Sequence, residues 1–361
     1  MAQNAIGRLF RGQSSSSLRQ SVGSLTQKRS YSRNAIPTFT QTSSADLDAA
    51  LNRFREELFI PFGLGTSQRR TIFRQKYADR LDEEPVTVPI SDTENFTLRP
   101  MDPQSRPTNK EAVDVIAQMQ TTQDWQNLLP FLSGLRMSHR RLNANRWEWV
   151  VRKAGQADAL GIVLECAKQA ERTNLRLTNA AFVKRLFFEI HRKAQVGEFQ
   201  DPAVSKALAL AQQFASLMEA PEHLVQDPAT DPKRKPAVIG VLLELSAARA
   251  LNVTGGKDET RDVRAYAQRL LGSWQAGNFS SEVKDWVNVD HMLQENVPIY
   301  NGMKLAMQVH GISNDRSIAP GLKTRINELG MLIANQKKLA TEKAQQQPTI
   351  GLAQSRLLHQ D

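Results

Sequence analysis

The feature that most constrains the fold is a helical spacing of apolar residues that continues, with few breaks, from Thr108 to Ala340. Apolar side chains recur there every three or four positions, as they do along one face of a helix, and no region alternates over more than a few positions as a half-buried strand would. The expected helices cover residues 108–120, 124–135, 145–155, 157–172, 178–194, 202–218, 237–251, 258–274, 285–293, 299–309 and 320–340. Short connections between such segments favour antiparallel hairpins, so the sequence predicts an all-α fold.

Single residues sharpen this prediction. Thr108 followed by Glu111 has the pattern of a capping box, which marks the start of a helix. Pro130 should end or kink the second helix, because proline lacks the N–H that a helix interior needs. Cys166, the one cysteine, lies on an apolar helical face, which predicts a buried and unreactive thiol and excludes an intrachain disulfide or a cysteine-based zinc site. The stretch 237–251 is so rich in apolar residues that we expect it to be the most buried helix of the second half.

Two helix pairs in the middle of the chain resemble a degenerate repeat. The spacing from Trp147 to Ala181 is 181 − 147 = 34 residues, and this stretch holds a helix, then Gly155, then a second helix. Such a unit resembles a pentatricopeptide or tetratricopeptide repeat, each of which is a helix pair about 34 residues long. A second copy, residues 178–218, is longer and lacks the glycine. The resemblance implies antiparallel helical hairpins of degenerate repeat type.

The N-terminus has the composition of a mitochondrial presequence. No Asp or Glu occurs in the first 45 residues, whereas arginines and serines are frequent. The segment from Arg29 to Ser32 resembles the pattern that the matrix processing peptidase cuts, so we expect cleavage after Tyr31 and a presequence of residues 1–31. The alternative is a disordered basic tail of a cytosolic or nuclear protein.

Composition divides the rest of the chain into regions. Residues 32–107 form an N-terminal extension with one helix, from about Ser44 to Leu58, followed by a strap with five prolines between residues 83 and 107. Repeated prolines exclude a helix and remove donors of sheet hydrogen bonds, which predicts an extended strap lying on a partner. The other expected regions are helical hairpins at 108–220, a basic polar loop at 221–236, a C-terminal helical region at 237–344 and a disordered Gln-rich tail at 345–361.

The net charge is less informative than its total suggests. The formal net charge is +10, and the five basic residues within 1–31 account for half of it, which leaves 10 − 5 = +5 for the mature chain. Only local clusters of charge, and not the overall basicity, can therefore indicate nucleic-acid binding. No run of apolar residues is long enough to predict a transmembrane helix.

The motifs that carry catalysis or bind cofactors are missing from the sequence. There is no phosphate-binding loop of Walker type, no dinucleotide fingerprint after a strand, no nucleophile elbow and no His-Glu-x-x-His pattern. The six histidines have no ligand spacing, and Asp285 and Asp290 do not share a helix face. Gly255-Gly256-Lys257 lacks the preceding strand of a phosphate loop. The sequence thus predicts no enzyme activity, no cofactor and no metal site.

Three basic clusters are candidates for contacts with RNA, because cations bind phosphates and flat side chains stack on unpaired bases. They comprise Arg69, Arg70 and Arg74; Arg136, His139, Arg140 and Arg141; and Lys233, Arg234 and Lys235. Trp147 and Trp149 lie close to the second cluster in sequence, although burial in a hairpin core is the favoured interpretation for both. An ordinary solvated turn or loop is the alternative for each cluster.

In organisation the chain resembles the fungal mitochondrial ribosomal proteins that combine a helical-repeat body with extended straps. This resemblance implies a structural component of the mitochondrial ribosome, with the large subunit favoured, located in the matrix and bound to ribosomal RNA and neighbouring ribosomal proteins. It implies no small-molecule substrate. Two alternatives stay open: a pentatricopeptide-like RNA-binding factor in transcript maturation or translation, and an assembly factor for a respiratory complex, which would need no RNA contact.

Overall fold

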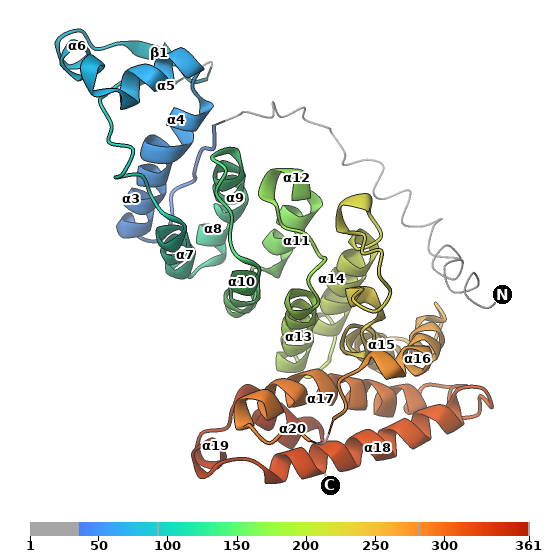
Figure 1. The fold of residues 1–361 in the computed structure, drawn as a ribbon. Helices are drawn as coiled ribbons and strands as arrows, with labels where there is room; N and C mark the ends of the chain where they lie inside the picture. The colour runs from blue at the N-terminus through green and yellow to red at the C-terminus, as the bar shows by residue number, and fades with distance from the viewer. Residues whose placement is uncertain (1–35, 92–93, 281, 360–361) are drawn as a thin grey trace. The chain divides into compact units, whose positions relative to one another are not determined.

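A computed structural model describes residues 36–91, 94–280 and 282–359 (Figure 1). The regular structure of these residues is helical apart from one small two-stranded sheet, so the prediction of an all-α fold is confirmed. Membership of the pentatricopeptide or tetratricopeptide class stays a prediction. The expected presequence, residues 1–31, lies outside the described residues.

The first described part of the chain is a helix followed by a small subdomain. Its elements are α3 (Ala45–Phe54), η1 (a π-helix, Arg55–Phe59), α4 (Ile60–Gly63), α5 (Thr66–Phe73), η2 (Gln75–Tyr77), α6 (Ala78–Glu83), β1 (Thr87–Pro89) and β2 (Asn95–Thr97). Residues 60–101, here called the N-terminal subdomain, have a core of their own. This core consists of Ile60, Leu64, Ile72, Leu81, Val88 and Leu98.

The strap that was expected to be extended folds back on the subdomain. β1 and β2 pair antiparallel with Val88 opposite Phe96, and the backbone N–H of Met101 donates to the carbonyl of Ile72 at 3.0 Å. The prolines allow this pairing because Pro89 ends its strand, where a missing N–H is tolerated. The described residues before Thr108 also hold more helix than the one segment expected. The structure therefore differs from the expected extended strap and from the expected single helix.

From Thr108 onward, successive helices pack against one another (Figure 1). They are α7 (Asn109–Gln118), α8 (Thr122–Trp125), α9 (Leu128–Met137), α10 (Ala144–Gln156), α11 (Leu160–Lys168), α12 (Ala170–Thr173), α13 (Ala180–Val196) and α14 (Ala203–Leu217). The predicted capping box is present, with the backbone N–H of Glu111 donating to the Thr108 hydroxyl at 3.3 Å. Cys166 is buried in the larger core, as predicted, and burial and the nearby Glu165 carboxylate raise the pKa of its thiol.

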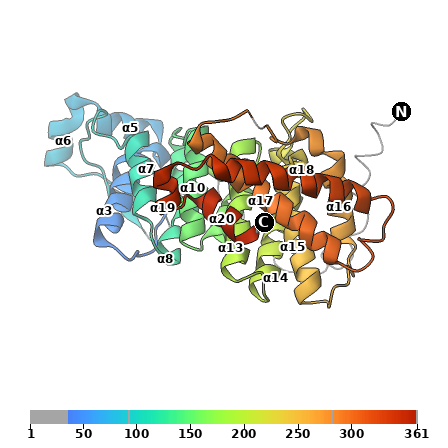
Figure 2. The same ribbon diagram turned by 90° about the horizontal axis from the view of Figure 1, so that it is seen from below.

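The second half of the chain is built on α15 (Pro236–Asn252), which is buried on nearly all sides, as its apolar sequence predicts. The other elements here are η3 (Pro221–His223), η4 (Pro232–Arg234), α16 (Asp262–Gly272), η5 (Trp274–Ala276), α17 (Trp286–Gln308) and α18 (Ala319–Lys338). α17 packs on α15, and Figure 2 shows α17 and α18 in front of it. The two helices cross closely, since a Cβ added to Gly302 would lie 2.8 Å from the carbonyl oxygen of Gly240.

α17 also corrects a prediction. The separate helices expected at 285–293 and 299–309 form this one helix, with Pro298 in its interior. Proline removes one backbone hydrogen bond from the helix. The burial of α17 along α15 outweighs that loss, which the local sequence could not reveal.

The C-terminal tail, expected to be disordered from residue 345, is helical in the structure. It forms α19 (Glu342–Gln346) and α20 (Ile350–Leu358). α20 packs on α17, where Leu352 is buried and its backbone N–H donates to Asp290 Oδ1 at 3.1 Å. The polar composition of the tail does not reveal these contacts, because Asp290 lies far from Leu352 in the sequence.

Candidate nucleic-acid interface

The turn that follows α9 holds one of the predicted basic clusters. The backbone N–H of Arg140 donates to the carbonyl of Leu135 at 2.7 Å, and His139 has a left-handed backbone with a φ of 58°. This is the geometry of a helix C-cap, which fixes the path of the turn. Arg136, His139 and Arg141 are exposed, while Arg140 is half-buried. The turn therefore presents four basic side chains from a defined backbone.

Helix α5 and its C-cap residue, Arg74, carry the first of the three predicted clusters. Arg70 and Arg74 are exposed, whereas Arg69 is half-buried and its guanidinium lies 5.7 Å from the ring centroid of Phe62. A cation over an aromatic face is attracted by the electrons of the ring, which helps to hold Arg69 in place. Arg69 is thus directed toward α4, the helix that carries Phe62.

Arg106 is a functional candidate that the sequence reasoning missed. It precedes α7, and its guanidinium lies 4.0 Å from the ring centroid of Phe73 and 5.8 Å from that of Phe62. The ring of His139 also contacts Phe62, with 6.1 Å between the ring centroids. Three segments that are distant in sequence, namely α5, the turn after α9 and the residues before α7, therefore meet around one ring. No local signal could have found Arg106, because it stands alone among prolines and polar residues.

The positive charges at this place have no carboxylate partner among the described residues. Burial lowers the pKa of Arg106, and the charges of Arg140 and Arg69 lower it further. The Nε atoms of Arg69 and Arg106 are buried and make no hydrogen bond within the described part of the chain. We call this set of residues the Phe62 cluster: Phe62, Phe73, Arg69, Arg106, His139 and Arg140. Its planar guanidinium groups can bind an anion that has two acceptor oxygens.

The side chains of the third predicted cluster form ion pairs and hydrogen bonds within the protein. Lys233 Nζ lies 3.0 Å from Glu219 Oε2, and Lys235 Nζ donates to a backbone carbonyl of the same loop at 2.8 Å. The Asp231 carboxylate oxygen Oδ2 lies 3.9 Å from Lys233 Nζ and 3.8 Å from Arg234 Nε. The run lies directly before α15, a helix that both Figure 1 and Figure 2 show away from α5. The structure therefore joins two of the three predicted clusters and leaves this one separate.

Trp147 and Trp149 pack against the larger core and are half-buried. Trp147 packs against Phe182 with 6.3 Å between the ring centroids, and Trp149 is partly buried against the larger core. The interpretation that favoured burial in the core is confirmed in part, because both side chains pack on the core and both stay partly exposed. Phe62 and Phe73 supply the aromatic groups beside the arginines instead.

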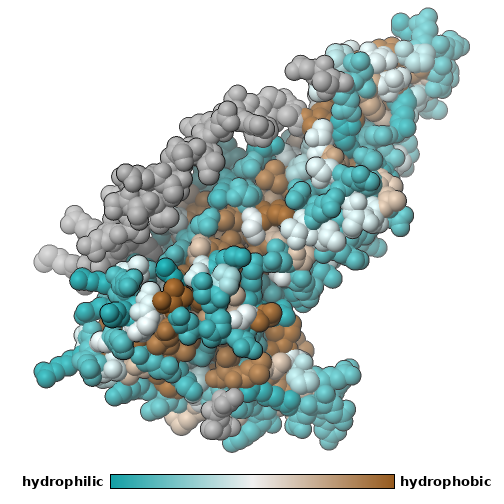
Figure 3. Space-filling model, turned by 180° about the vertical axis from the view of Figure 1, so that it is seen from behind, coloured by the Kyte–Doolittle hydropathy of each residue, from teal (hydrophilic) through white to brown (hydrophobic). Residues whose placement is uncertain are grey.

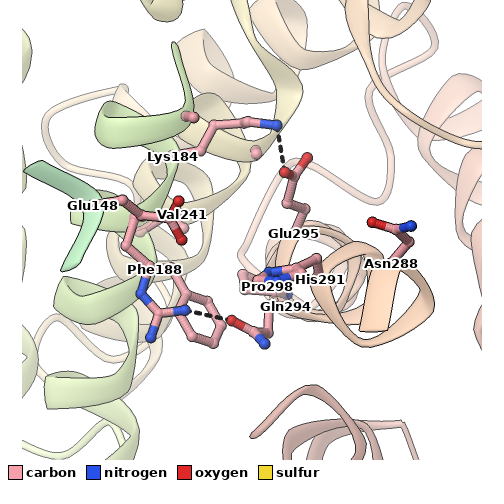
Figure 4. Close-up of a pocket in the computed structure, with 12 residues that line it drawn as sticks. Glu148, Lys184, Phe188, Val241, Asn288, His291, Gln294, Glu295 and Pro298 are labelled. Atoms are coloured by element: carbon pink, nitrogen blue, oxygen red, sulfur yellow. Dashed lines mark hydrogen bonds and ion pairs between the residues drawn. The ribbon is translucent and has the colours of Figure 1, made fainter. Parts of the chain in front are cut away.

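A cleft of about 240 Å³ with both polar and apolar lining lies between α10, α13, α15 and α17 (Figure 4). Lys184 forms an ion pair with Glu295 across it. Arg185 Nη1 donates to Gln294 Oε1 at 2.6 Å, and Arg185 Nη2 lies 2.7 Å from Glu189 Oε1. Both cations have a carboxylate partner in the protein, whereas the arginines of the Phe62 cluster have none among the described residues, so the Phe62 cluster is the better candidate for binding an anion.

The chain matches a known family over nearly its whole length. A family model described as mitochondrial ribosomal protein mS27 matches residues 24–357. The chain belongs to this family. A relative from Neurospora crassa, the small ribosomal subunit protein mS27, is 29% identical over 262 residues, which cover 67% of this chain and 66% of the relative. The match thus spans slightly less than two thirds of that relative's length.

Membership of the mS27 family confirms two predictions. The resemblance to fungal mitochondrial ribosomal proteins holds, and so does the mitochondrial location. The expected large subunit is not supported, because the mS27 relative is named as a protein of the small subunit. That preference had no basis in particular residues of the chain.

In the part of the chain that the structure describes, no group of three or more His, Cys, Asp or Glu side chains is placed to hold a metal ion. No helix among these residues is both long enough and apolar enough to cross a membrane.

Proposed function

We propose that this chain is a structural component of the small subunit of the mitochondrial ribosome, where it contacts ribosomal RNA and neighbouring ribosomal proteins and supports mitochondrial translation. The observation that carries the proposal is the family match over residues 24–357. The similarity to the Neurospora crassa protein, which is named as a small ribosomal subunit protein, supports the small subunit. The same membership favours a structural role over an enzymatic one.

The surface is suited to two kinds of partner. The Phe62 cluster offers positive charge without a carboxylate partner in the described residues, which suits RNA. Figure 3 shows a mainly hydrophilic surface over the N-terminal subdomain and hydrophobic patches lower on the same face. Exposed apolar side chains on the C-terminal helices, which suit contacts with proteins, include Val287, Met331 and Leu357.

Sedimentation of a mitochondrial lysate that contains the tagged chain tests this proposal. The chain should comigrate with the small subunit at moderate salt. A nuclease-sensitive particle lighter than a subunit would indicate a free pentatricopeptide-like RNA-binding factor instead. A light particle that resists nuclease would indicate an assembly factor for a respiratory complex, and comigration with the large subunit would contradict the choice of subunit.

We also propose that residues 1–31 are removed on import, so that the mature protein begins at Ser32. The absence of acidic residues from the first 45 positions and the pattern from Arg29 to Ser32 support this cleavage. Mass spectrometry of the N-terminal peptide from isolated mitochondria checks it. A mature protein that still begins at Met1 or Ala2 would contradict the cleavage.

A further inference from the structure

We propose that the Phe62 cluster is a site for backbone phosphates of RNA, assembled from α5, the turn after α9 and the segment before α7. The inference rests on the proposed function, since ribosomal RNA would supply the phosphates. The proposed site contains Arg106, Phe62 and Phe73 in addition to the basic residues that lie in runs along the sequence.

The positive charges of the Phe62 cluster repel one another. Arg69 and Arg140 are close enough to Arg106 to lower its pKa, in addition to the effect of burial. Among the described residues no carboxylate forms an ion pair with these three side chains, so none of these residues offsets the repulsion. An anion bound between the guanidinium groups would replace this repulsion by attraction. The free protein therefore carries an electrostatic cost that a phosphate group removes.

The cluster also has hydrogen-bond donors that lack acceptors. The buried Nε atoms of Arg69 and Arg106 make no hydrogen bond with any described residue. A buried donor without an acceptor is unfavourable, and a phosphate oxygen is an acceptor that charge strengthens. Phe73 covers one face of the Arg106 guanidinium at 4.0 Å, and the N–H groups of Arg106 lie in the guanidinium plane, at its edge. A ligand would therefore approach this guanidinium at its edge and not at the face that the ring covers.

The surroundings of the cluster favour a polyanion over a single carboxylate. Four more arginines are exposed on the same segments: Arg70, Arg74, Arg136 and Arg141. Residues 65–77 and 136–146 contain no Asp or Glu. An RNA strand presents a negative charge at every nucleotide, whereas a protein partner presents a carboxylate only where its sequence has one. One carboxylate cannot neutralise a group of cations as large as this one. The group therefore fits an RNA backbone.

Binding of a short fluorescent RNA hairpin to the purified chain, measured across a salt series, tests the site. Arg106→Gln should weaken binding roughly tenfold, the size expected when a charged hydrogen-bonding group is lost. The slope of log affinity against log salt should fall by about one for the same variant. Arg106→Lys should give an intermediate affinity, because lysine keeps the charge and loses the planar pair of donors.

Arg325→Gln is a matched control. Arg325 also lies over an aromatic ring, 5.1 Å from the centroid of Trp274, but it is paired with Glu328. This variant should bind RNA as the unaltered chain does, and thermal melting should show that every variant remains folded. A folded Arg106→Gln variant with unchanged affinity and unchanged salt slope would disprove the site.

Sedimentation separates this inference from the proposed function. If the unaltered chain comigrates with the small subunit and Arg106→Gln binds RNA normally, only the inference fails. If the unaltered chain does not comigrate, the proposed function fails. Loss of crosslinks to an acidic ribosomal protein with unchanged RNA affinity would assign the cluster to a protein partner, and binding to vesicles of anionic phospholipid without binding to RNA would assign it to a lipid. Either result overturns the inference.

Discussion

At the scale of single residues, Asp124 connects the start of the described chain to the helical body. Its carboxylate accepts hydrogen bonds from the backbone N–H groups of Ser43 at 2.8 Å, Thr121 at 2.9 Å and Gln120 at 3.0 Å. The Ser43 hydroxyl donates to it as well, at 2.9 Å. Burial raises the pKa of Asp124, but these donors outweigh burial and bring the pKa down to about 2.

We expect the Asp124→Asn variant to lose the pH-dependent contribution that Asp124 makes to the free energy of unfolding. The folded pKa of Asp124 lies below its ordinary value of 3.8, so its contribution is present above that value and is lost as the pH falls toward 2. The variant should be less stable than the unaltered chain by about 1–2 kcal/mol at neutral pH. Urea unfolding at neutral and at acidic pH checks this, and a difference that does not shrink in acid would contradict it.

A second buried polar group links three helices. His191 on α13 and Glu244 on α15 are both fully buried, and His191 Nδ1 donates to the Glu244 carboxylate. Asn301 on α17 donates its Nδ2 to the other oxygen of Glu244 at 2.7 Å. One carboxylate thus satisfies donors from two neighbouring helices.

We expect Glu244→Leu to lower the free energy of unfolding by about 3–5 kcal/mol, because it leaves buried donors without an acceptor. The double variant Glu244→Leu with His191→Phe should recover part of this loss, since the polar group of His191 is then also replaced by an apolar one. Chemical denaturation of both single variants and the double variant measures the coupling. Strictly additive losses would show that the two side chains act independently.

At the scale of elements, the crossing of α15 and α17 depends on glycine. A Cβ added to Gly302 would lie 2.8 Å from the Gly240 carbonyl oxygen and 2.9 Å from the backbone nitrogen of Glu244, and neither backbone atom can move without shifting a helix. Gly302→Ala should therefore destabilise the protein by about 1–3 kcal/mol. Gly161 on α11 provides the control, since its added Cβ would meet nothing within 4 Å.

Gly161→Ala should leave stability unchanged or raise it by up to about 1 kcal/mol, because alanine favours a helix over glycine. Thermal denaturation of the two alanine variants gives the comparison. If Gly302→Ala melts at or above the temperature of Gly161→Ala, the close crossing described for α15 and α17 is incorrect.

The elements that could be predicted are those whose signal lies in consecutive residues. The apolar spacing of α13 and α15 shows in any short stretch of their sequence. α20 could not be predicted, because Leu352 and Asp290, which hold it on α17, lie far apart along the chain. Arg106 joins the candidate site for a similar reason, since only the folded chain brings it to Phe73. Basic runs therefore indicated part of the site, and its completion needed tertiary contacts.

At the scale of the whole molecule, the distribution of charge is more informative than its total. Half of the net charge of +10 belongs to residues 1–31. On the described part of the chain, cations such as Lys184 and Lys233 have carboxylate partners. The arginines of the Phe62 cluster, in contrast, form no ion pair with a described residue. The cluster therefore stands out on a chain whose overall basicity is moderate.

The molar amount of this chain in purified mitochondrial small subunits tests the central claim most directly. Subunits washed at high salt and quantified by mass spectrometry should contain the chain in the same molar amount as the other small-subunit proteins. Large subunits from the same preparation should lack it. A chain that the wash removes, that is present in much lower amount than the other proteins, or that is found on the large subunit would contradict a structural place in the small subunit.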